Sequence, residues 1–223
     1  TVQVRRADGT VDELGTVDVV LPILHGVHGE DGTVQGFFDT LEIPYAGGGV
    51  LDSALCMDKH FMKIVLQAAG IPAEEAALDE LGLPLFVKPA RAGSSVGVSK
   101  VSAIDELPEA LAVAFAEDDK VLIESAIVGR EIEVAILDGR GGTPPRASLP
   151  GEVVLTTRDF YDFEGKYLGG DGVSIVCPAE VSLAELAQMQ ALGVRAFQAV
   201  GGRGLARVDF FLSAERGWLI NEL

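Results

Sequence analysis

Two alternating segments near the carboxyl end constrain the fold of this chain most. Ala206–Leu212 and Trp218–Glu222 are rich in apolar, aromatic and β-branched residues, and a short turn that ends in Gly217 joins them. Such a pattern predicts a β-hairpin. We therefore expect antiparallel strands in the second half of the chain.

Three segments show the spacing of amphipathic helices. The first is Thr33–Leu41, whose apolar stripe we expect to be buried; it consists of Val34, Phe37, Phe38 and Leu41. A second helix is predicted to start at a cap on Asp52 and to run to Ala69. The third follows an S-x-x-E capping box at Ser182 and ends at a glycine pair.

Segments of strand character alternate with these helices. Val17–Leu24 is a nearly continuous apolar run that leads into a glycine-rich loop, which is typical of a buried parallel strand. Glu131–Leu137 alternates strictly between polar and apolar residues, and Leu85–Lys88 and Val121–Glu124 are shorter strands. We predict an α/β protein with α+β character in its second half, built from mixed sheets with flanking helices.

Composition excludes several classes of partner. The formal net charge is -17, whereas a nucleic-acid binder needs a positive surface to displace counterions. Hydrophobic residues make up 48% of the chain, but no apolar run reaches the roughly 20 residues of a membrane helix. We therefore expect neither a nucleic acid nor a membrane as partner.

Cysteine content and the amino end indicate the compartment. Cys56 and Cys177 are too few for a disulfide framework, and no secretory signal opens the chain. We expect a cytoplasmic protein. Because the sequence begins at Thr1 without a methionine, we also expect a processed chain or a part of a longer one.

The glycine-rich segment Lys88–Gly97 is a candidate phosphate loop. A lysine at the end of a strand is followed by two glycines and two serines, which let backbone N–H groups and hydroxyls approach a phosphate. The alternative is an ordinary hairpin with an exposed lysine. The G-x-x-x-x-G-K-[ST] and G-x-G-x-x-G signatures of other nucleotide sites are absent, and Gly47–Gly49 is interpreted as a permissive turn.

Two glutamates flank the short linker between predicted strands. Glu124 and Glu131 stand on either side of residues 125–130, an arrangement that could hold an adenine edge and accept hydrogen bonds from ribose hydroxyls. Glutamates on surface strands are the alternative interpretation.

The hairpin carries a candidate metal site. Arg207 and Asp209 share one face of their strand, and Asn221 and Glu222 end the facing strand. Carboxylate and amide oxygens suit Mg²⁺, whereas an ion pair between Arg207 and Asp209 is the alternative.

The register of the hairpin decides between these two interpretations. Pairing Leu212 with Trp218 puts Glu222 on the far face, whereas pairing Leu212 with Leu219 sets Glu222 opposite Asp209. We predict the second register, or a bulge with the same effect.

The loop His25–Gly32 contains two histidines and two acids. A zinc site would need further ligands from elsewhere in the chain, and His60 is the one other histidine. We therefore predict a substrate loop at the carboxyl end of a strand.

Taken in order, these segments resemble the D-alanine–D-alanine ligases of the ATP-grasp superfamily. The matching stretches are 25–32 with 35–36, 43–45, 57–59, 82–97, 121–124, 160–167, 204–209 and 221–222. The resemblance implies an ATP-grasp fold, preceded by the remainder of an amino-terminal α/β domain. It divides the chain into residues 1–50 (substrate domain), 51–125 (central subdomain with a phosphate lid) and 126–223 (carboxy-terminal subdomain with metal and catalytic residues).

The resemblance also implies roles for individual residues. ATP would be bound by Lys59, Lys88, Ser94, Ser95, Val96, Glu124, Ile127, Glu131 and Lys166. Mg²⁺ or Mn²⁺ would be bound by Asp209 and Glu222, and a monovalent cation would be compatible with the site. Substrate positioning and catalysis would fall to His25, Glu30, Ser94, Lys166, Tyr167 and Arg207.

The implied reaction joins two D-alanines for peptidoglycan precursors. One carboxylate attacks the γ-phosphate of ATP, and the amine of the second D-alanine attacks the acyl phosphate. Such chemistry depends on positioning and charge neutralisation, and 159–172 is a candidate closing loop. A homodimer is the family expectation.

Several features depart from the family pattern. The amino-terminal glycine-rich strand–turn–helix is absent, the chain is short between Pro72 and Leu78, and it stops one residue before an expected Asn ligand. We therefore expect a partial record of a longer enzyme. The alternatives are a D-alanine–D-lactate ligase and a non-catalytic nucleotide-binding module. Lys166 and Tyr167 favour the dipeptide-forming enzyme over the D-lactate ligase.

Overall fold

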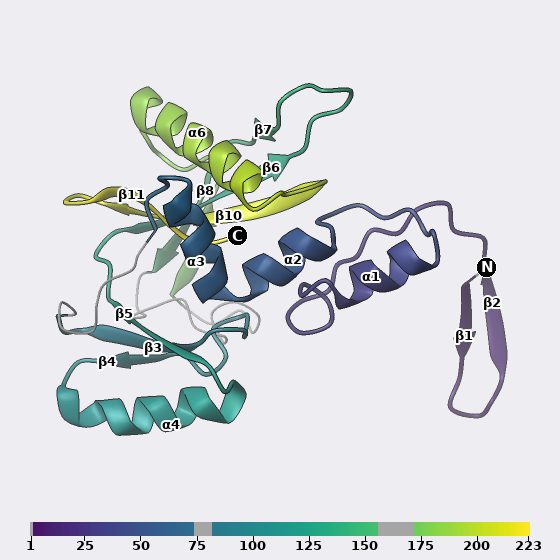
Figure 1. Ribbon diagram of the computed structural model, residues 1–223, viewed down its shortest axis with the longest axis horizontal. Coiled ribbons are helices and arrows are strands. Elements are labelled where there is room, and N and C mark those ends of the chain that lie inside the picture. The colour runs from purple at the N-terminus through teal and green to yellow at the C-terminus, as the bar shows by residue number, and fades with distance from the viewer. Residues whose placement is uncertain (1, 74–81, 156–171) are drawn as a thin grey trace.

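A computed structural model describes residues 2–73, 82–155 and 172–223 of the chain. Figure 1 shows two sheets that face each other across the middle of the molecule and an amino-terminal region extending to one side. This arrangement of mixed sheets with flanking helices agrees with the predicted fold class.

The larger sheet is antiparallel and follows the order β11-β10-β6-β8-β9. The short strand β7 also pairs with β6, outside this order. Its strands are β6 (Arg130–Leu137), β7 (Arg146–Ala147), β8 (Gly151–Leu155), β9 (Val173–Val176), β10 (Leu205–Ser213) and β11 (Gly217–Glu222). The predicted alternation of β6 is confirmed, since Ile132, Val134 and Ile136 are buried. One face of this sheet therefore carries the main core.

Two helices cover that face. The helix α6 (Leu183–Ala199) begins at the predicted capping box, in which Ser182 and Glu185 bond reciprocally. The helix α3 (Lys59–Ala68) packs beside it and contributes Met62 and Leu66 to the same core. In Figure 1, α6 and α3 lie together over the strands of the larger sheet.

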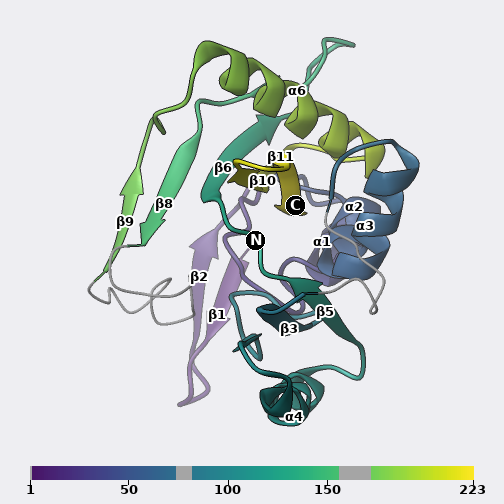
Figure 2. The ribbon, with the colours of Figure 1, turned by 90° about the vertical axis from the view of Figure 1, so that its left-hand side faces the viewer.

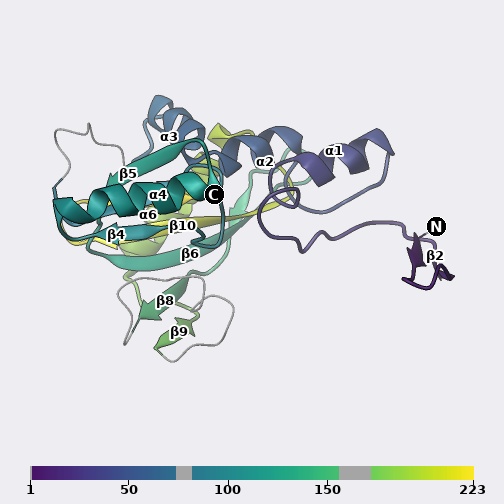
Figure 3. The same cartoon turned by 90° about the horizontal axis from the view of Figure 1, so that it is seen from below.

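The smaller sheet has the order β4-β3-β5 and is also antiparallel. Its strands are β3 (Leu85–Pro89), β4 (Ser99–Val101) and β5 (Val121–Ser125). A 3-10 turn (Ile104–Glu106) leads into α4 (Leu107–Glu117), which covers the outer face. Figure 3 looks onto α4 from outside, with the sheet behind it.

The β10–β11 hairpin contains the predicted bulge. Leu212 pairs with Trp218 and Phe210 with Ile220, but the register then shifts by one residue and Asp209 lies opposite Glu222. A bulge admits one extra residue and turns the following side chains to the other face. Asp209 and Glu222 are thereby paired although the hairpin starts in the unfavourable register.

The predicted helix from Asp52 to Ala69 is wrong in one respect, because two helices occupy this segment. The helix α2 (Val50–Met57) ends at Asp58, which has an extended backbone. The Asp58 side chain accepts hydrogen bonds from the backbone N–H groups of His60 and Phe61 and so caps α3. Asp52 is no cap; it lies buried within the first turn of α2.

The predicted strand Val17–Leu24 is not formed. Within the described residues it makes one isolated bridge, between Val20 and Tyr45, and Leu21 and Ile23 are 64% and 75% exposed. A buried parallel strand needs neighbouring strands and covering helices, and the described part of the chain does not provide them. A hairpin that was not predicted, β1 (Val2–Arg5) with β2 (Val11–Gly15), precedes it.

The helix α1 (Thr33–Thr40) is confirmed, but its expected buried stripe is not. Phe37 and Leu41 are 57% and 52% exposed, and Gln35 is the buried residue of the helix. Figures 1 and 3 show α1 and the β1–β2 hairpin to one side of the two larger sheets, and in Figure 2, seen from the opposite side, they lie in the background. The stripe is exposed because α1 packs mainly against α2.

Candidate functional site

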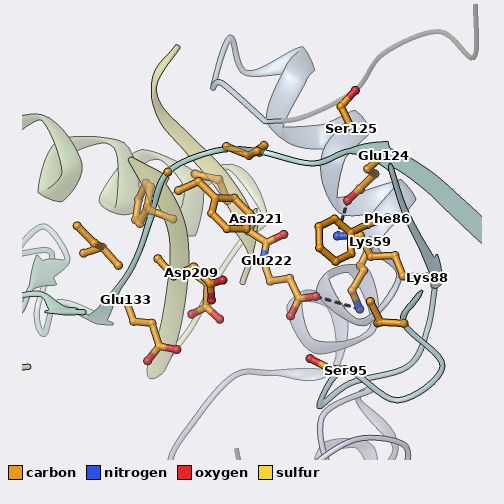
Figure 4. A pocket seen from close by; sticks show the side chains of 18 of the residues that line it. Lys59, Phe86, Lys88, Ser95, Glu124, Ser125, Glu133, Asp209, Asn221 and Glu222 are labelled. Carbon is orange, nitrogen blue, oxygen red and sulfur yellow. Dashed lines mark ion pairs between the residues drawn. The ribbon is translucent and has the colours of Figure 1, made fainter. Parts of the chain in front are cut away.

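A cavity of about 240 Å³ separates the smaller sheet from the larger one. We call it the first cavity. Figure 4 shows residues of both sheets around it. Its lining includes Lys59, Phe86, Lys88, Ser95, Glu124, Ile127, Glu131, Glu133, Asp209, Asn221 and Glu222.

A second cavity, of about 520 Å³, adjoins the first. Its lining includes His25, Glu30, Ser94 and Arg207. Among the described residues, the two cavities share Lys59, Ala92, Glu133, Asp209 and Glu222 in their linings. A molecule in one cavity can therefore reach a molecule in the other at this group.

Lys59 connects α3 to both the glycine-rich loop and the hairpin. Its side chain is buried; the ammonium donates to the Ala92 carbonyl at 2.6 Å and lies 3.2 Å from the Glu222 carboxylate. A dashed line in Figure 4 marks the ion pair. The sequence-predicted Lys59 thus lies at the junction of the cavities.

Lys88, at the end of β3, lies in a buried charge cluster. One carboxylate oxygen of Glu124 contacts Lys88 and the other contacts Lys63. Burial alone would raise the pKa of Glu124, but Lys88 and Lys63 outweigh it and lower the pKa to about 2. Glu124 is therefore ionised at neutral pH. It lies beside the first cavity and also takes part in ion pairs.

The serines of the glycine-rich loop face different cavities. Ser94 and Ser95 both have a left-handed backbone, with φ of 57° and 58°. Ser94 lines the second cavity and Ser95 the first, whereas Val96 lines neither and is 37% exposed. Two successive residues of this kind store strain of the sort found at ligand-binding loops.

Three carboxylates form a row across neighbouring strands. Glu133 of β6 pairs in register with Asp209 of β10, which pairs with Glu222 of β11. Arg207 bonds both oxygens of Asp209, at 2.6 and 2.7 Å, and lies 3.6 Å from Glu133. The hydrogen bonds to Asp209 are the main cause that raises the pKa of Arg207, so Arg207 keeps its charge.

The loop at 25–32 is held by its own acids. The Glu30 carboxylate accepts from the backbone N–H of Gly26, and Asp31 accepts from those of His28 and Thr33. His25 and Glu30 face the second cavity. Among residues 2–73, 82–155 and 172–223, no group of three or more His, Cys, Asp or Glu side chains is arranged to hold a metal.

The remaining predicted residues divide into two groups. Ile127 and Glu131 line the first cavity, as a nucleotide-binding linker requires. Lys166 and Tyr167, together with the proposed closing loop, lie outside the described residues.

Two residues of the site were not predicted from the sequence. Lys63 lies four residues after Lys59, one helical turn along the inward face of α3, and this spacing was the available signal. Glu133 lies two residues after Glu131 on the same face of β6, and this alternation was the available signal.

In comparisons with known proteins, two models of one protein family match the two parts of the chain. The family model described as "D-ala D-ala ligase C-terminus" matches residues 61–223, and "D-ala D-ala ligase N-terminus" matches residues 2–48. A D-alanine–D-alanine ligase of Arthrobacter sp. is 47% identical over 95% of this chain and 60% of its own length. The corresponding ligase of Corynebacterium aurimucosum is 49% identical over 93% of this chain and 62% of its own length.

Solved structures show the same likeness. The D-alanine–D-alanine ligase from Coxiella burnetii has a TM-score of 0.78 at 35% identity, covering 93% of this chain and 58% of that one. The VanG D-Ala:D-Ser ligase from Enterococcus faecalis has a TM-score of 0.81 at 34% identity, covering 94% of this chain and 64% of that one.

These likenesses define the class of protein first. Two sheets enclosing a cavity lined by lysines and carboxylates form the ATP-grasp fold. Within that class, the chain belongs to the D-alanine–D-alanine ligase family. It spans about three fifths of the length of the two ligases to which it was aligned. No helix in the described part is long and apolar enough to cross a membrane.

Proposed function

We propose that this protein joins two D-alanine molecules with ATP and supplies the dipeptide for peptidoglycan precursors. The observation that carries the proposal is the junction at which the two cavities share Lys59, Glu133, Asp209 and Glu222. ATP would lie in the first cavity and D-alanine in the second. The γ-phosphate and the substrate carboxylate would then meet at this group of residues.

The residues at the junction suit phosphoryl transfer to a carboxylate. Lys59 and Lys88 would bind phosphate oxygens and neutralise their charge, which this chemistry demands more than covalent catalysis. The D-alanine carboxylate oxygen attacks the γ-phosphorus, and ADP leaves. The amine of the second D-alanine then attacks the acyl phosphate carbonyl, and phosphate leaves with the bridging oxygen.

Asp209 and Glu222 fit a divalent cation. They are hard oxygen donors that the bulge sets opposite each other, and both line the first cavity. Two carboxylates match Mg²⁺, which keeps several waters and substrate oxygens as its other ligands. When bound, such an ion supplies positive charge to the phosphates. Arg207 would stabilise the negative charge that develops on the attacked carbonyl oxygen.

The family likeness also supports a homodimer in the cytoplasm as part of this proposal. The division into units 1–50, 51–125 and 126–223 stays a prediction.

A phosphate-release assay on the full-length protein tests the function. We expect phosphate when ATP, Mg²⁺ and D-alanine are present together, and little when D-alanine is left out. Adding D-lactate or D-serine to limiting D-alanine, with product analysis by mass spectrometry, distinguishes a D-alanine–D-lactate or D-alanine–D-serine ligase. If the protein binds ATP but shows no turnover in all of these conditions, it is a non-catalytic module and the proposal is contradicted.

A further inference from the structure

A buried lysine, Lys63, takes no part in the chemistry proposed above. It lies on α3 between Met62 and Leu66, is 3% exposed, and lines neither cavity. Burying an ammonium group is costly unless a carboxylate compensates its charge. Its position therefore requires a specific electrostatic partner.

Glu124 of β5 is such a partner. Its side chain is 9% exposed and contacts Lys63 with one oxygen and Lys88 with the other. Within the described part of the chain, these two lysines and one carboxylate together carry a net charge of about +1. Lys88 and Glu124 line the first cavity, whereas Lys63 belongs to the cluster without lining the cavity.

We propose that Lys63 is a positioning residue for the nucleotide site: it neutralises Glu124 so that Lys88 keeps its positive charge for a phosphate group in the first cavity. Without Lys63, Glu124 would have Lys88 as its counter-charge. A phosphate would then compete with a buried carboxylate for the same ammonium. The inference rests on the proposed function, because it needs a phosphate ligand in the first cavity.

A purely structural role for Lys63 makes a different prediction. If Lys63 only fills space and anchors α3, replacing it should loosen the helix whatever residue stands at position 124. If charge balance matters, removing the charge of Glu124 as well should restore the net charge of about +1 on the cluster, now carried by Lys88 alone.

The experiment is a calorimetric titration of the full-length protein with ATP and Mg²⁺, together with thermal unfolding of each variant. Lys63→Met should weaken binding at least about tenfold, the factor that corresponds to about 1.4 kcal/mol. The double variant Lys63→Met with Glu124→Gln is compared with Glu124→Gln alone, because Glu124 itself lines the first cavity; it should bind ATP about as well as that single variant. Arg195→Met is the matched control, because Arg195 bonds the carbonyl groups of Ala69 and Gly70 at the other end of α3.

Each outcome decides the proposal. Weak binding by Lys63→Met, equal affinity of the double variant and Glu124→Gln, and normal binding by Arg195→Met support it. Equal affinity of Lys63→Met and wild type overturns it, as does a double variant that binds ATP about tenfold more weakly than Glu124→Gln alone. If Lys63→Met does not fold, the double variant decides alone: affinity close to that of Glu124→Gln supports the proposal, and a tenfold loss relative to Glu124→Gln overturns it. A wild type that binds no ATP removes the proposed function and this inference with it.

Discussion

Arg207 and its carboxylates carry most of the proposed chemistry at the scale of single residues. The guanidinium bonds both oxygens of Asp209 and approaches Glu133. A planar fork binds two oxygens at once, whereas the ammonium of lysine is a point charge. The orientation of Arg207 toward the junction of the cavities therefore depends on its shape as well as its charge.

Arg207→Lys should lower turnover without abolishing nucleotide binding. Losing a group that stabilises a developing oxyanion typically costs roughly 10²–10³ in kcat. Steady-state kinetics of the full-length protein, alongside ATP titration, measures both quantities. Arg146→Lys, an exposed arginine on β7, is the control. Full activity of Arg207→Lys would show that charge alone suffices there.

Asp118 gives a prediction for the dependence of stability on pH. Burial would raise the pKa of Asp118, but hydrogen bonds from Arg91 and the backbone outweigh it and lower the pKa to about 2. A carboxyl group with a depressed folded-state pKa stabilises the protein above its unfolded pKa. That contribution is lost as the pH falls through the folded value.

Asp118→Asn should therefore unfold at a lower temperature than wild type at pH 7, and the gap should close between about pH 5 and pH 2. Thermal unfolding at a series of pH values measures this. Asp105→Asn, at an exposed position of the same region, serves as control. A gap that stays constant with pH would mean that the Arg91 contacts do not stabilise the ionised form.

At the scale of elements, the close packing between α6 and the larger sheet limits the size of the residues that can stand where they meet. A Cβ atom on Gly193 would lie 3.1 Å from Ile136 and 3.4 Å from Val134. These are core side chains of β6 that leave no room for a larger residue. The helix can approach the sheet this closely because position 193 has no side chain.

Gly193→Leu should lower the free energy of unfolding by about 1–3 kcal/mol, as overpacking of a core typically does. Urea denaturation of the variant measures the loss. Ala191→Leu introduces the same leucine side chain on the exposed side of α6 and should leave stability nearly unchanged. Equal effects of the two substitutions would rule out close packing at Gly193 as the cause.

Periodicity predicted the elements that are amphipathic by themselves, and failed where tertiary contacts decide. The helix α6 and the strand β6 carry complete local signals, namely a capping box and strict alternation. The break at Asp58 was missed because the apolar spacing continues through it. Val17–Leu24 looks like a buried strand, but burial depends on neighbours that a pattern cannot supply.

The candidate site was predictable to the extent that its residues belong to recognisable motifs. The metal hypothesis required a bulge or a shifted register to pair Asp209 with Glu222, but the alternation alone could not choose between them, since either register satisfies it. Lys63 and Glu133 were not predicted, because the role of each depends on a contact with a residue that is distant in sequence or on a neighbouring strand.

At the scale of the whole molecule, the arrangement of the two sheets is the central feature. The first cavity lies between them, and the second opens beside it toward α2 and the loop at 25–32. The bulge, Lys59 and the glycine-rich loop come from different parts of the chain and meet where the cavities join. This convergence supports a reaction in which a carboxylate takes up a phosphoryl group.

Oxygen tracing tests that central claim most directly. The full-length protein is incubated with ATP, Mg²⁺ and D-alanine whose carboxylate oxygens are both ¹⁸O, and the released phosphate is examined by mass spectrometry. An acyl phosphate route transfers one labelled oxygen to each phosphate, because the bridging oxygen leaves with phosphorus. We expect one ¹⁸O per phosphate and one dipeptide per phosphate; unlabelled phosphate accompanying the dipeptide would contradict the account.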